Sequence, residues 1–434
     1  MLDARLIREQ PDAVRANLAR RNDPTVLARF DEYVALDRAA REAQRRADEL
    51  RKERNTLSRT IGEAKKKGGD APADVLQRAK SLDADLDTLG KEAEAATEKA
   101  QAILMRLPNL LHETVPYGTS DKENVQVYQW GEPRKFPFPV KSHGELAEEL
   151  GLGEFKRAAK VAGAGFAYLR GDLARLDFAL QMFAIDHLTA RNFTLIEVPF
   201  MMRREPYSGV TDLGDFETVM YKIENEDLYL IATSEHPIGG MYMDEIVTED
   251  SLPLRYAGIS ACFRKEIGAH GVDTRGLFRM HQFNKIEQFV FCAPEESEKI
   301  HEEILENAKS LFRALGIPHR VVNVCTGDIG TVAAKKYDIE GWSPRQEKWV
   351  ELVSCSNCTD YQARRLRLRM GKAGSPQKRV PHTLNSTAVA TSRALVVILE
   401  NYQQEDGSVV IPEVLRPYMG GKTKLEPLPQ VKAA

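Results

Sequence analysis

The chain has 434 residues, of which 42% are hydrophobic and 29% are charged, and its formal net charge is −3. This length suggests two or three domains with a large core, and the composition is that of a globular protein. Because the net charge is close to zero, a nucleic-acid partner would have to bind a local basic patch and not the protein as a whole.

Two further features narrow the class of protein. The sequence contains no apolar run of the roughly 20 residues that a membrane helix requires. The N-terminal stretch MLDARLIREQPDAVRANLARR lacks the apolar segment of a secretory signal, and its acidic residues argue against a transit peptide. The five cysteines are an odd number and are thinly spread, which is typical of a reducing compartment. We therefore expect a cytoplasmic protein that does not associate with membranes.

The first predicted element is a pair of long helices between about Leu36 and Leu107, a region without aromatic residues. In both helices the seam residues recur at alternating spacings of four and three, which is the heptad pattern of a coiled coil. The first seam has one break, at Arg54, and consists of Leu36, Ala40, Ala43, Ala47, Leu50, Arg54, Leu57 and Ile61. The second seam is unbroken and consists of Val75, Ala79, Leu82, Leu86, Leu89, Ala93, Ala96, Ala100, Ile103 and Leu107.

A tight turn is predicted between the two seams, in KKKGGDAP, where Gly68 and Gly69 end one helix and Pro72 begins the next. The result is an antiparallel hairpin of roughly 45–55 Å at about 1.5 Å per residue. Its first helix is rich in arginine and lysine. Such a surface is either a solvated coiled-coil face or an arm that binds nucleic-acid phosphates, and the arm alone does not decide between them.

A connector with proline and glycine spans Leu107 to Val125, and beyond it helical and strand patterns are mixed. Helices are predicted near Ser142–Leu150, Gly171–Arg191 and Glu295–Leu315. Strands are predicted in FTLIEVP, DLYLI, QFVFC, HRVVNVC and KWVELVS. Because the two types do not alternate strictly, we expect an α+β domain on a mainly antiparallel sheet. The expected domains are residues 1–115 and 116–434.

The stretch ISACFRKEIGAHGVDTRGLFRMHQFNKIEQFVF predicts two strands joined by a polar loop that contains Gly268, Gly271 and Gly276. Alternate residues of a strand face the same way, so one face of this hairpin would be strongly charged. It is either an exposed ladder of ion pairs or a wall for an anionic substrate. The residues of that face are Arg264, Glu266, Arg279, His281, Phe283, Lys285 and Glu287.

The C-terminal third adds oxygen ligands and one unusual arginine. Glu351 and Ser354, at the end of an apolar strand, offer a carboxylate and a hydroxyl that can hold Mg²⁺. From Ala388 onward the sequence predicts a helix that is apolar on all sides and therefore buried. Arg393 lies within it and needs an anion, either a bound phosphate or a carboxylate such as Glu400.

Three features that suggest other chemistry are interpreted as structural. Cys355 and Cys358 form a C-x-x-C, but a zinc site needs four ligands and the other cysteines are scattered. A redox C-x-x-C would begin a helix, whereas this one ends a strand. His270 and His281 are interpreted as polar residues of the loop and the strand.

In this order, the motifs resemble those of the class II aminoacyl-tRNA synthetases and, among them, the seryl-tRNA synthetases. NFTLIEVPFMMRRE, with Pro199, resembles the first class II motif, which builds the dimer interface. FRKE with GLFRMHQFNKIEQF resembles the second, and HTLNSTAVATSRALVVILENYQ with VIPEVLRPYMGG resembles the third. LIATSEHP resembles the serine-binding segment, and the hairpin resembles the tRNA-binding arm. The resemblance covers essentially the whole chain.

The resemblance implies a class II catalytic domain with an N-terminal coiled-coil arm. It implies that serine is activated by ATP, with Mg²⁺, to seryl-adenylate and is then transferred to tRNA(Ser), with tRNA(Sec) as a further candidate acceptor. It also implies a homodimer.

The resemblance also assigns roles to individual residues. The catalytic set is Arg264, Glu351 and Arg393. The serine-binding set is Thr233, Ser234, Glu235, Arg264, Glu287, Asn385 and Thr387. The ATP-binding set is Arg264, Lys265, Glu266, Arg279, Met280, Phe283, Glu351, Leu352, Val353, Ser354 and Arg393. The metal ligands are Glu351 and Ser354.

Two alternative functions would share parts of this sequence pattern. An adenylating ligase that loads a carrier protein would share the catalytic scaffold, but such relatives lack the long arm. A non-catalytic tRNA-binding protein would be expected to have lost Arg264, Glu266, Glu351 or Arg393, and all four are present.

Overall fold

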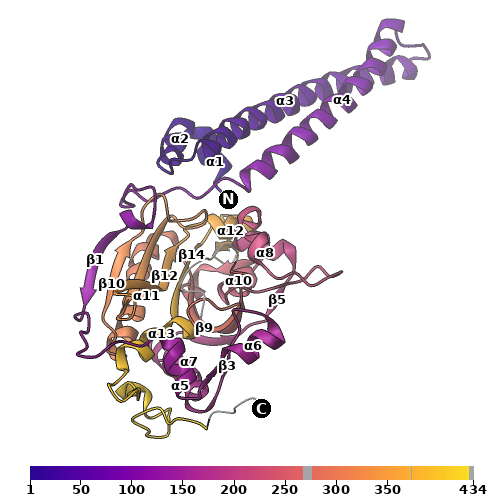
Figure 1. Ribbon diagram of the computed structural model, residues 1–434. Helices are drawn as coiled ribbons and strands as arrows, with labels where there is room; N and C mark the ends of the chain where they lie inside the picture. Colours follow the sequence, from indigo (N-terminus) through magenta and orange to yellow (C-terminus); the bar gives the residue numbers. More distant parts are fainter. Residues whose placement is uncertain (267–275, 373, 430–434) are drawn as a thin grey trace. The chain divides into compact units, whose positions relative to one another are not determined.

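The computed structural model describes residues 1–266, 276–372 and 374–429. The chain divides into two compact units, Met1–Pro108 and Asn109–Ala434 (Figure 1). The boundary expected after residue 115 lies a little further along the chain and stays a prediction. Among the described residues, no helix is both long enough and apolar enough to cross a membrane.

The N-terminal unit contains the predicted antiparallel pair of long helices. Its helices are α1 Ala4–Glu9, α2 Pro11–Ala19, α3 Pro24–Lys66 and α4 Ala73–Leu104. The seams face each other, with Ala40 and Ala47 of α3 and Leu82 of α4 buried between them. Helix α3 starts earlier than the heptads indicate, because Pro24 occupies its first turn and the Asp23 side chain caps the Thr25 amide at 2.8 Å.

Ion pairs connect α3 to α1 and α4, and one of them explains the break in the seam of α3. Arg54 is exposed and pairs with Asp83 of α4 at 3.3 Å, so the guanidinium leaves the apolar seam. Asp37 is buried and binds Arg8 of α1 at 2.6 Å and Arg41 at 3.0 Å. Two arginines thus compensate one buried carboxylate, and the pair with Arg8 connects α1 to α3.

The second unit is built on an eight-stranded sheet with the order β1-β10-β11-β12-β14-β9-β8-β4. All neighbours in it are antiparallel except β4 and β8, which confirms the expected α+β fold on a mainly antiparallel sheet. These strands are β1 Val125–Trp130, β4 Thr194–Glu197, β8 Leu254–Phe263, β9 Gln282–Cys292, β10 His319–Asn323, β11 Lys335–Ser343, β12 Lys348–Asn357 and β14 His382–Ala390.

Shorter elements complete the unit. The small strands are β2 Gly153–Glu154, β3 Tyr168–Leu169, β5 Met201–Met202, β6 Tyr229–Leu230, β7 Ile246–Thr248 and β13 Arg369–Gly371. The helices are α5 His143–Glu149, α6 Phe155–Ala162, α7 Gly171–Thr189, α8 Arg204–Val210, α9 Leu213–Phe216, α10 Glu235–Gly240, α11 Ser297–Ala314, α12 Tyr361–Arg365 and α13 Thr391–Tyr402. Single 3₁₀ turns are η1 Asp121–Glu123, η2 Glu217–Val219, η3 Glu249–Ser251, η5 Pro294–Glu296 and η6 Glu413–Leu415.

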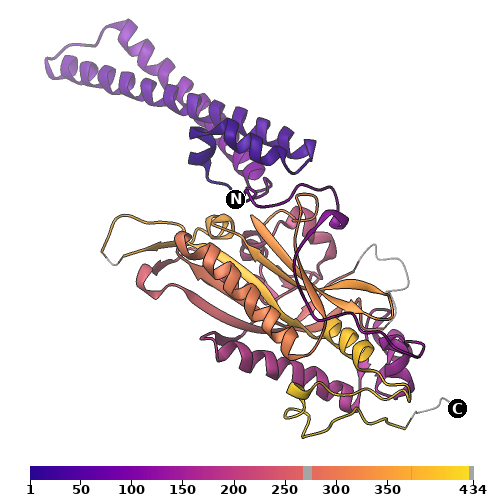
Figure 2. The ribbon, with the colours of Figure 1, turned by 90° about the vertical axis from the view of Figure 1, so that its left-hand side faces the viewer.

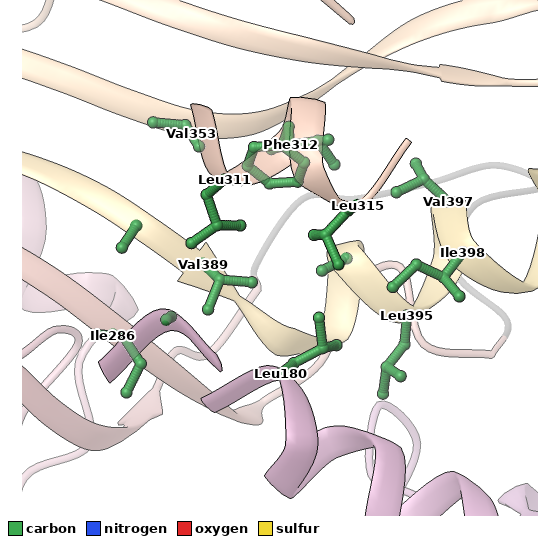
Figure 3. Packing of buried hydrophobic residues seen from close by; sticks show 14 of the residues in the cluster. Leu180, Ile286, Leu311, Phe312, Leu315, Val353, Val389, Leu395, Val397 and Ile398 are labelled. Carbon is green, nitrogen blue, oxygen red and sulfur yellow. The ribbon is translucent and has the colours of Figure 1, made fainter. Parts of the chain in front are cut away.

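The apolar core lies between one face of the large sheet and the helices α7, α11 and α13, which pack against its strands (Figure 2). Figure 3 shows Ile286 and Val389 of neighbouring strands gathered with Leu180 of α7 and Leu311 of α11. Because successive strand residues alternate between the two faces, the residues between these core positions project to the opposite face. The candidate site lies there.

The structure corrects two boundaries expected from the sequence. The helix expected from Ala388 begins at Thr391, because Ala388–Ala390 complete strand β14, which pairs with β9 through a register shift after Thr387. A fully buried strand and a buried helix are both continuous apolar runs, so periodicity does not separate them.

The second correction concerns the charged hairpin. Strand β8 ends at Phe263 and β9 begins at Gln282, so Arg264, Glu266, Arg279 and His281 flank the strands. The predicted loop residues Gly268, Gly271 and His270 lie outside the described residues.

Candidate active site

One cavity of about 490 Å³ opens on the face of the sheet opposite the helices α7, α11 and α13. Most of the predicted site residues line it although they come from five separate stretches of the chain. They are Thr233, Glu235, Arg264, Glu266, Arg279, Met280, Phe283, Glu287, Glu351, Leu352, Ser354, Asn385, Thr387 and Arg393.

Three predicted residues have side chains outside the lining of the cavity. Val353 faces the helices and is fully buried in the core. The Ser234 hydroxyl donates to the Gly258 carbonyl at 3.2 Å. The Lys265 ammonium lies 5.7 Å from the centre of the Tyr221 ring. A role for any of them in binding stays a prediction.

Strand alternation and sheet register explain why the other residues meet. On β9, Phe283 and Glu287 share the cavity face with the residue between them, Lys285. On β14, Thr387 lies opposite Glu287 in the register. On β12, Ser354 lies opposite Asp338 of β11. Neighbouring strands therefore place a carboxylate and a hydroxyl side by side twice.

The first carboxylate, Glu287, is neutralised by a cation. Its Oε2 lies 2.5 Å from Lys285 Nζ and accepts a hydrogen bond from the Thr387 hydroxyl at 3.3 Å. The side chains of the ion pair are only 7% and 1% exposed. Burial raises the pKa of Glu287, and the charge of Lys285 is the largest effect that opposes it.

The second carboxylate, Glu235, is held by amides and has no cation bonded to it in the described part of the chain. Its Oε1 accepts hydrogen bonds from Asn385 Nδ2 at 3.1 Å and Gln362 Nε2 at 3.2 Å. Burial, and then the nearby charge of Glu287, raise the pKa of Glu235 to about 7. At neutral pH this carboxylate is therefore close to its titration point, and an arriving cation would favour its ionised form.

Three arginines and two aromatic rings also line the cavity. The guanidinium of Arg264 lies 5.4 Å from the centre of the Phe283 ring, within cation–π distance. The guanidinium of Arg393 lies 5.4 Å from the Phe278 ring. Arg279 faces Glu266 at 3.5 Å.

Arg393 is paired with Glu351 and not with Glu400. Its Nη1 donates to the Glu351 main-chain carbonyl at 2.8 Å and lies 3.3 Å from the carboxylate oxygen Oε2. Glu400 instead lies 3.0 Å from His143 Nδ1 and accepts a hydrogen bond from the Ser343 hydroxyl at 2.6 Å. The alternative partner proposed from the sequence is therefore wrong. The Arg393 side chain is 26% exposed, so it reaches toward the cavity.

Oxygen ligands suited to Mg²⁺ lie beside this pair. The Glu351 side chain is 47% exposed because it lines the cavity. Desolvation by the surrounding protein raises its pKa, but the charges of Arg393, Lys336 and Arg264 and the hydrogen bond from Arg393 together outweigh it. The pKa is therefore lowered and the group is ionised. Asp338 contacts Lys336 Nζ at 3.2 Å through Oδ2, while its buried Oδ1 has no hydrogen-bond partner among the described residues.

This donor set fits a metal that also binds substrate oxygens. Among the described residues, no group of three or more His, Cys, Asp or Glu side chains could hold a metal ion. Mg²⁺ commonly takes one or two carboxylates and completes its shell with phosphates and water. The two oxygen-bearing side chains Glu351 and Ser354 meet that requirement.

Four polar residues of this site receive no role from the sequence analysis. Lys285 was placed on the charged face without a role, although its i,i+2 spacing to Glu287 was a signal for an ion pair. Lys336 and Asp338 show the same spacing on β11. Gln362 had no local signal, because it contacts Glu235, which lies 127 residues earlier in the chain.

Comparisons with known proteins agree over nearly the whole chain. Residues 1–111 match the seryl-tRNA synthetase N-terminal domain, and residues 218–402 match the class II tRNA synthetase core domain (G, H, P, S and T). The serine–tRNA ligase of Methanocella arvoryzae is 59% identical over 97% of this chain and 99% of its own length. That of Archaeoglobus fulgidus is 48% identical over 95% of each.

Solved structures give the same result. The seryl-tRNA synthetase of Pyrococcus horikoshii, complexed with ATP, superposes with a TM-score of 0.95 at 45% identity and covers 99% of this chain and 100% of its own. The cytoplasmic serine–tRNA ligase of Naegleria fowleri, in complex with AMP, gives 0.88 at 36% identity over 98% and 99%.

Proposed function

The chain belongs to the seryl-tRNA synthetases of class II, and we propose how the residues of its cavity divide the recognition of serine and ATP between them. As a serine–tRNA ligase, it activates serine with ATP to seryl-adenylate and transfers the seryl group to tRNA(Ser). The division of roles rests on the charges and hydrogen bonds of the cavity.

The two carboxylates receive different groups of serine. Glu287 already has a cation, Lys285, so it suits the neutral hydroxyl of the substrate. In the part of the chain that the structure describes, Glu235 has only amide donors, both on one oxygen. It therefore suits the substrate ammonium, with the Thr233 hydroxyl in the same cavity lining. This difference in charge is the observation that carries the assignment. Alanine would leave the hydroxyl-binding groups unpaired, which is the strongest basis a pocket has for rejecting an analogue.

The arginine end of the cavity receives ATP. Phe283 offers a ring face for adenine, and Glu266 with the main chain near Met280 lies beside it for the base edge. Arg264 stands between the two carboxylates and the aromatic ring, where the serine carboxylate would attack the α-phosphate and charge would build up. Arg279 and Arg393 add positive charge for the remaining phosphates. ATP binding itself agrees with the ATP complex of the similar Pyrococcus horikoshii enzyme.

Glu351 and Ser354 would hold Mg²⁺ against the phosphates. When bound, the ion supplies Lewis-acid stabilisation of phosphate charge. The contribution of this chain is to keep Glu351 ionised through Arg393 and to place the Ser354 hydroxyl on the same strand.

The hairpin of α3 and α4 is the tRNA-binding arm of this family, and its contacts with tRNA belong to the proposal. Its basic first helix would follow the shape of an RNA helix through phosphates and 2′-hydroxyls. Transfer to tRNA(Sec) and a cytoplasmic location stay predictions.

A homodimer is proposed through the region that resembles the first class II motif. Phe178 and Met182 of α7, four residues apart, are 66% and 46% exposed. Leu195 of β4 is 46% exposed, and β4 is an edge strand of the large sheet. Phe200 and Met201 follow at 40% and 45%. An apolar cluster beside an open sheet edge is a typical interface feature.

The test is transfer of labelled serine to total tRNA by the purified protein with ATP and Mg²⁺, alongside labelled alanine and threonine. We expect nuclease-sensitive label from serine only. Adenylate formation without labelled tRNA would favour the carrier-protein ligase, and no adenylate would favour the non-catalytic protein. In the Glu287→Gln variant, discrimination against alanine should fall, while ATP binding should persist.

A further inference from the structure

Gln362 of α12 is a fully buried amide that contacts the candidate ammonium-binding carboxylate. Its Nε2 donates to the Val210 carbonyl at 2.9 Å and to Glu235 Oε1 at 3.2 Å. Its Oε1 accepts a hydrogen bond from the Thr383 hydroxyl at 2.6 Å. Both of the two amide hydrogens are therefore used, and the carbonyl oxygen is also bonded.

The amide has only one acceptable orientation. A main-chain carbonyl and a carboxylate are both acceptors, so turning the amide over would set three oxygens against one another in a buried site. The short helix that carries it is fixed as well, because Arg365 donates to the main-chain carbonyls of Ser208 and Thr211 at 2.7 and 3.1 Å. Gln362 therefore presents a rigid N–H to Glu235.

We propose that Gln362 is a positioning residue for serine binding, which holds the Glu235 carboxylate in one orientation and leaves its second oxygen for the substrate ammonium. This inference rests on the proposed function of Glu235. Asn385 donates to the same oxygen at 3.1 Å, so the two amides together select Oε1 as the structural oxygen. In the described part of the chain, Oε2 has no hydrogen-bond donor.

The surroundings make this hydrogen bond important for the charge state of Glu235. Burial raises the pKa of Glu235 to about 7, and the Gln362 hydrogen bond is one of the effects that lower it. Without that hydrogen bond the pKa of Glu235 would be higher. The carboxyl group would then be protonated over a wider pH range, and in that form it would not attract an ammonium group. The titratable and charged groups that interact with Glu235 are Glu287, Lys285, Arg264, Tyr207 and Cys358, and His236 is the next residue along the chain.

The experiment measures kcat/KM for serine between pH 6 and 8.5 by ATP–pyrophosphate exchange. For the wild type we expect kcat/KM to rise with pH through an inflection near 7, because ionised Glu235 binds the ammonium. In Gln362→Met we expect the inflection to move to higher pH and the KM for serine at pH 7 to rise about tenfold or more, the scale of a hydrogen bond to a charged group. The KM for ATP should stay unchanged.

A matched control separates this role from general loss of a buried amide. Gln403 is 2% exposed, and among the described residues its side chain bonds only to main-chain groups of Lys141 and Glu400. It does not line the cavity. Gln403→Met should leave the inflection and the serine KM unchanged, and an equal shift in this variant would overturn the proposal. Should Gln362→Met fail to fold, Thr383→Val keeps the amide but frees its oxygen, and we expect a smaller shift in the same direction.

The variant Glu235→Gln distinguishes failure of this inference from failure of the site assignment. If Glu235→Gln loses serine affinity while Gln362→Met and Thr383→Val keep the wild-type KM and inflection, the positioning role is wrong and the serine site stands. If Glu235→Gln also binds serine normally, the ammonium site itself is wrong, and the inference falls with it.

Discussion

Replacing Lys285 with methionine tests how the protein stabilises the buried carboxylate of Glu287. The substitution keeps most of the side-chain volume and removes the cation 2.5 Å from Glu287 Oε2. Since neither side chain of the pair is more than 7% exposed, the unpaired carboxylate cannot regain its hydration and will bind a proton instead. Protonating an ordinary glutamate at pH 7 costs about 3.7 kcal/mol. Its pKa near 4.3 lies about 2.7 units below that pH, and each unit corresponds to about 1.36 kcal/mol.

We therefore expect Lys285→Met to lower the free energy of unfolding by about 3–4 kcal/mol at pH 7, within the range of about 3–5 kcal/mol for broken buried pairs. The sign of the pH dependence follows from the same reasoning. Burial raises the folded-state pKa of Glu287, and Lys285 no longer opposes it in the variant. In the variant, the contribution of the protonated Glu287 to stability is fully present below about pH 4.3 and is lost as pH rises toward the folded pKa. The loss of stability relative to the wild type should therefore shrink to about 1 kcal/mol at pH 5.

Urea unfolding followed by tryptophan fluorescence at pH 5 and pH 7 measures the effect. Trp130, Trp342 and Trp349 all belong to the unit Asn109–Ala434, so the signal does not report on the arm. As a control, Lys141→Met breaks an exposed pair with Glu149 in the same unit and should cost less than about 1 kcal/mol. The double variant Lys285→Met with Glu287→Leu should recover most of the stability but not serine binding. A penalty below about 1 kcal/mol at pH 7, or an equal penalty at both pH values, would refute the reasoning.

Three further predictions follow from the site, the arm and the apolar surface. Arg393→Ala should keep the fold, because its partner Glu351 faces the cavity, and should lower ATP–pyrophosphate exchange by about 10²–10³-fold, the effect of removing one preorganised charge donor; a wild-type rate would contradict its role. Deleting residues 36–102 should leave adenylate formation intact and abolish tRNA charging, and full charging by the truncated chain would show that the arm is not needed. Met182→Asp should place a charge in the exposed apolar cluster and convert the proposed dimer to a monomer in analytical ultracentrifugation, whereas Ile246→Asp, at another exposed apolar residue, should not; an unchanged dimer in Met182→Asp would place the interface elsewhere.

The parts of the fold that depend on local pattern could be predicted from the sequence. The hairpin arm was predictable because a heptad seam repeats over many turns, so single exceptions such as Arg54 do not obscure it. Strand β11 went unrecognised because its sequence, KKYDIEGWS, mixes charged and apolar residues, and its identity depends on pairing with β10 and β12. The start of α13 was misplaced because the register shift after Thr387 is a property of the pairing with β9.

The same distinction applies to the candidate site. Residues within a motif, such as Arg264 or Phe283, were expected in the site because the motif resembles one of a known family, and both line the cavity. Gln362 could not be assigned, because its contact with Glu235 joins segments 127 residues apart and depends on the path of the chain through α12. The place of Asp338 in the site could not be predicted either, because its position opposite Ser354 follows from the sheet register.

If Arg393 binds phosphate as proposed, its pairing with Glu351 keeps the charged groups in place before ATP arrives. An unpaired arginine beside Glu351 would lose hydration without compensation, and an unpaired carboxylate there would be protonated more easily. At 3.3 Å the two groups hold each other in place at the edge of the cavity, and the Arg393 guanidinium helps to lower the pKa of Glu351. Phosphate oxygens would pair with Arg393, and a divalent cation would pair with Glu351. The ion pair between the two residues could then be replaced by two pairs with the ligands, without leaving either charge unpaired. The anion that the sequence demands for Arg393 is therefore a carboxylate in the free protein, and we expect it to be a phosphate during the reaction.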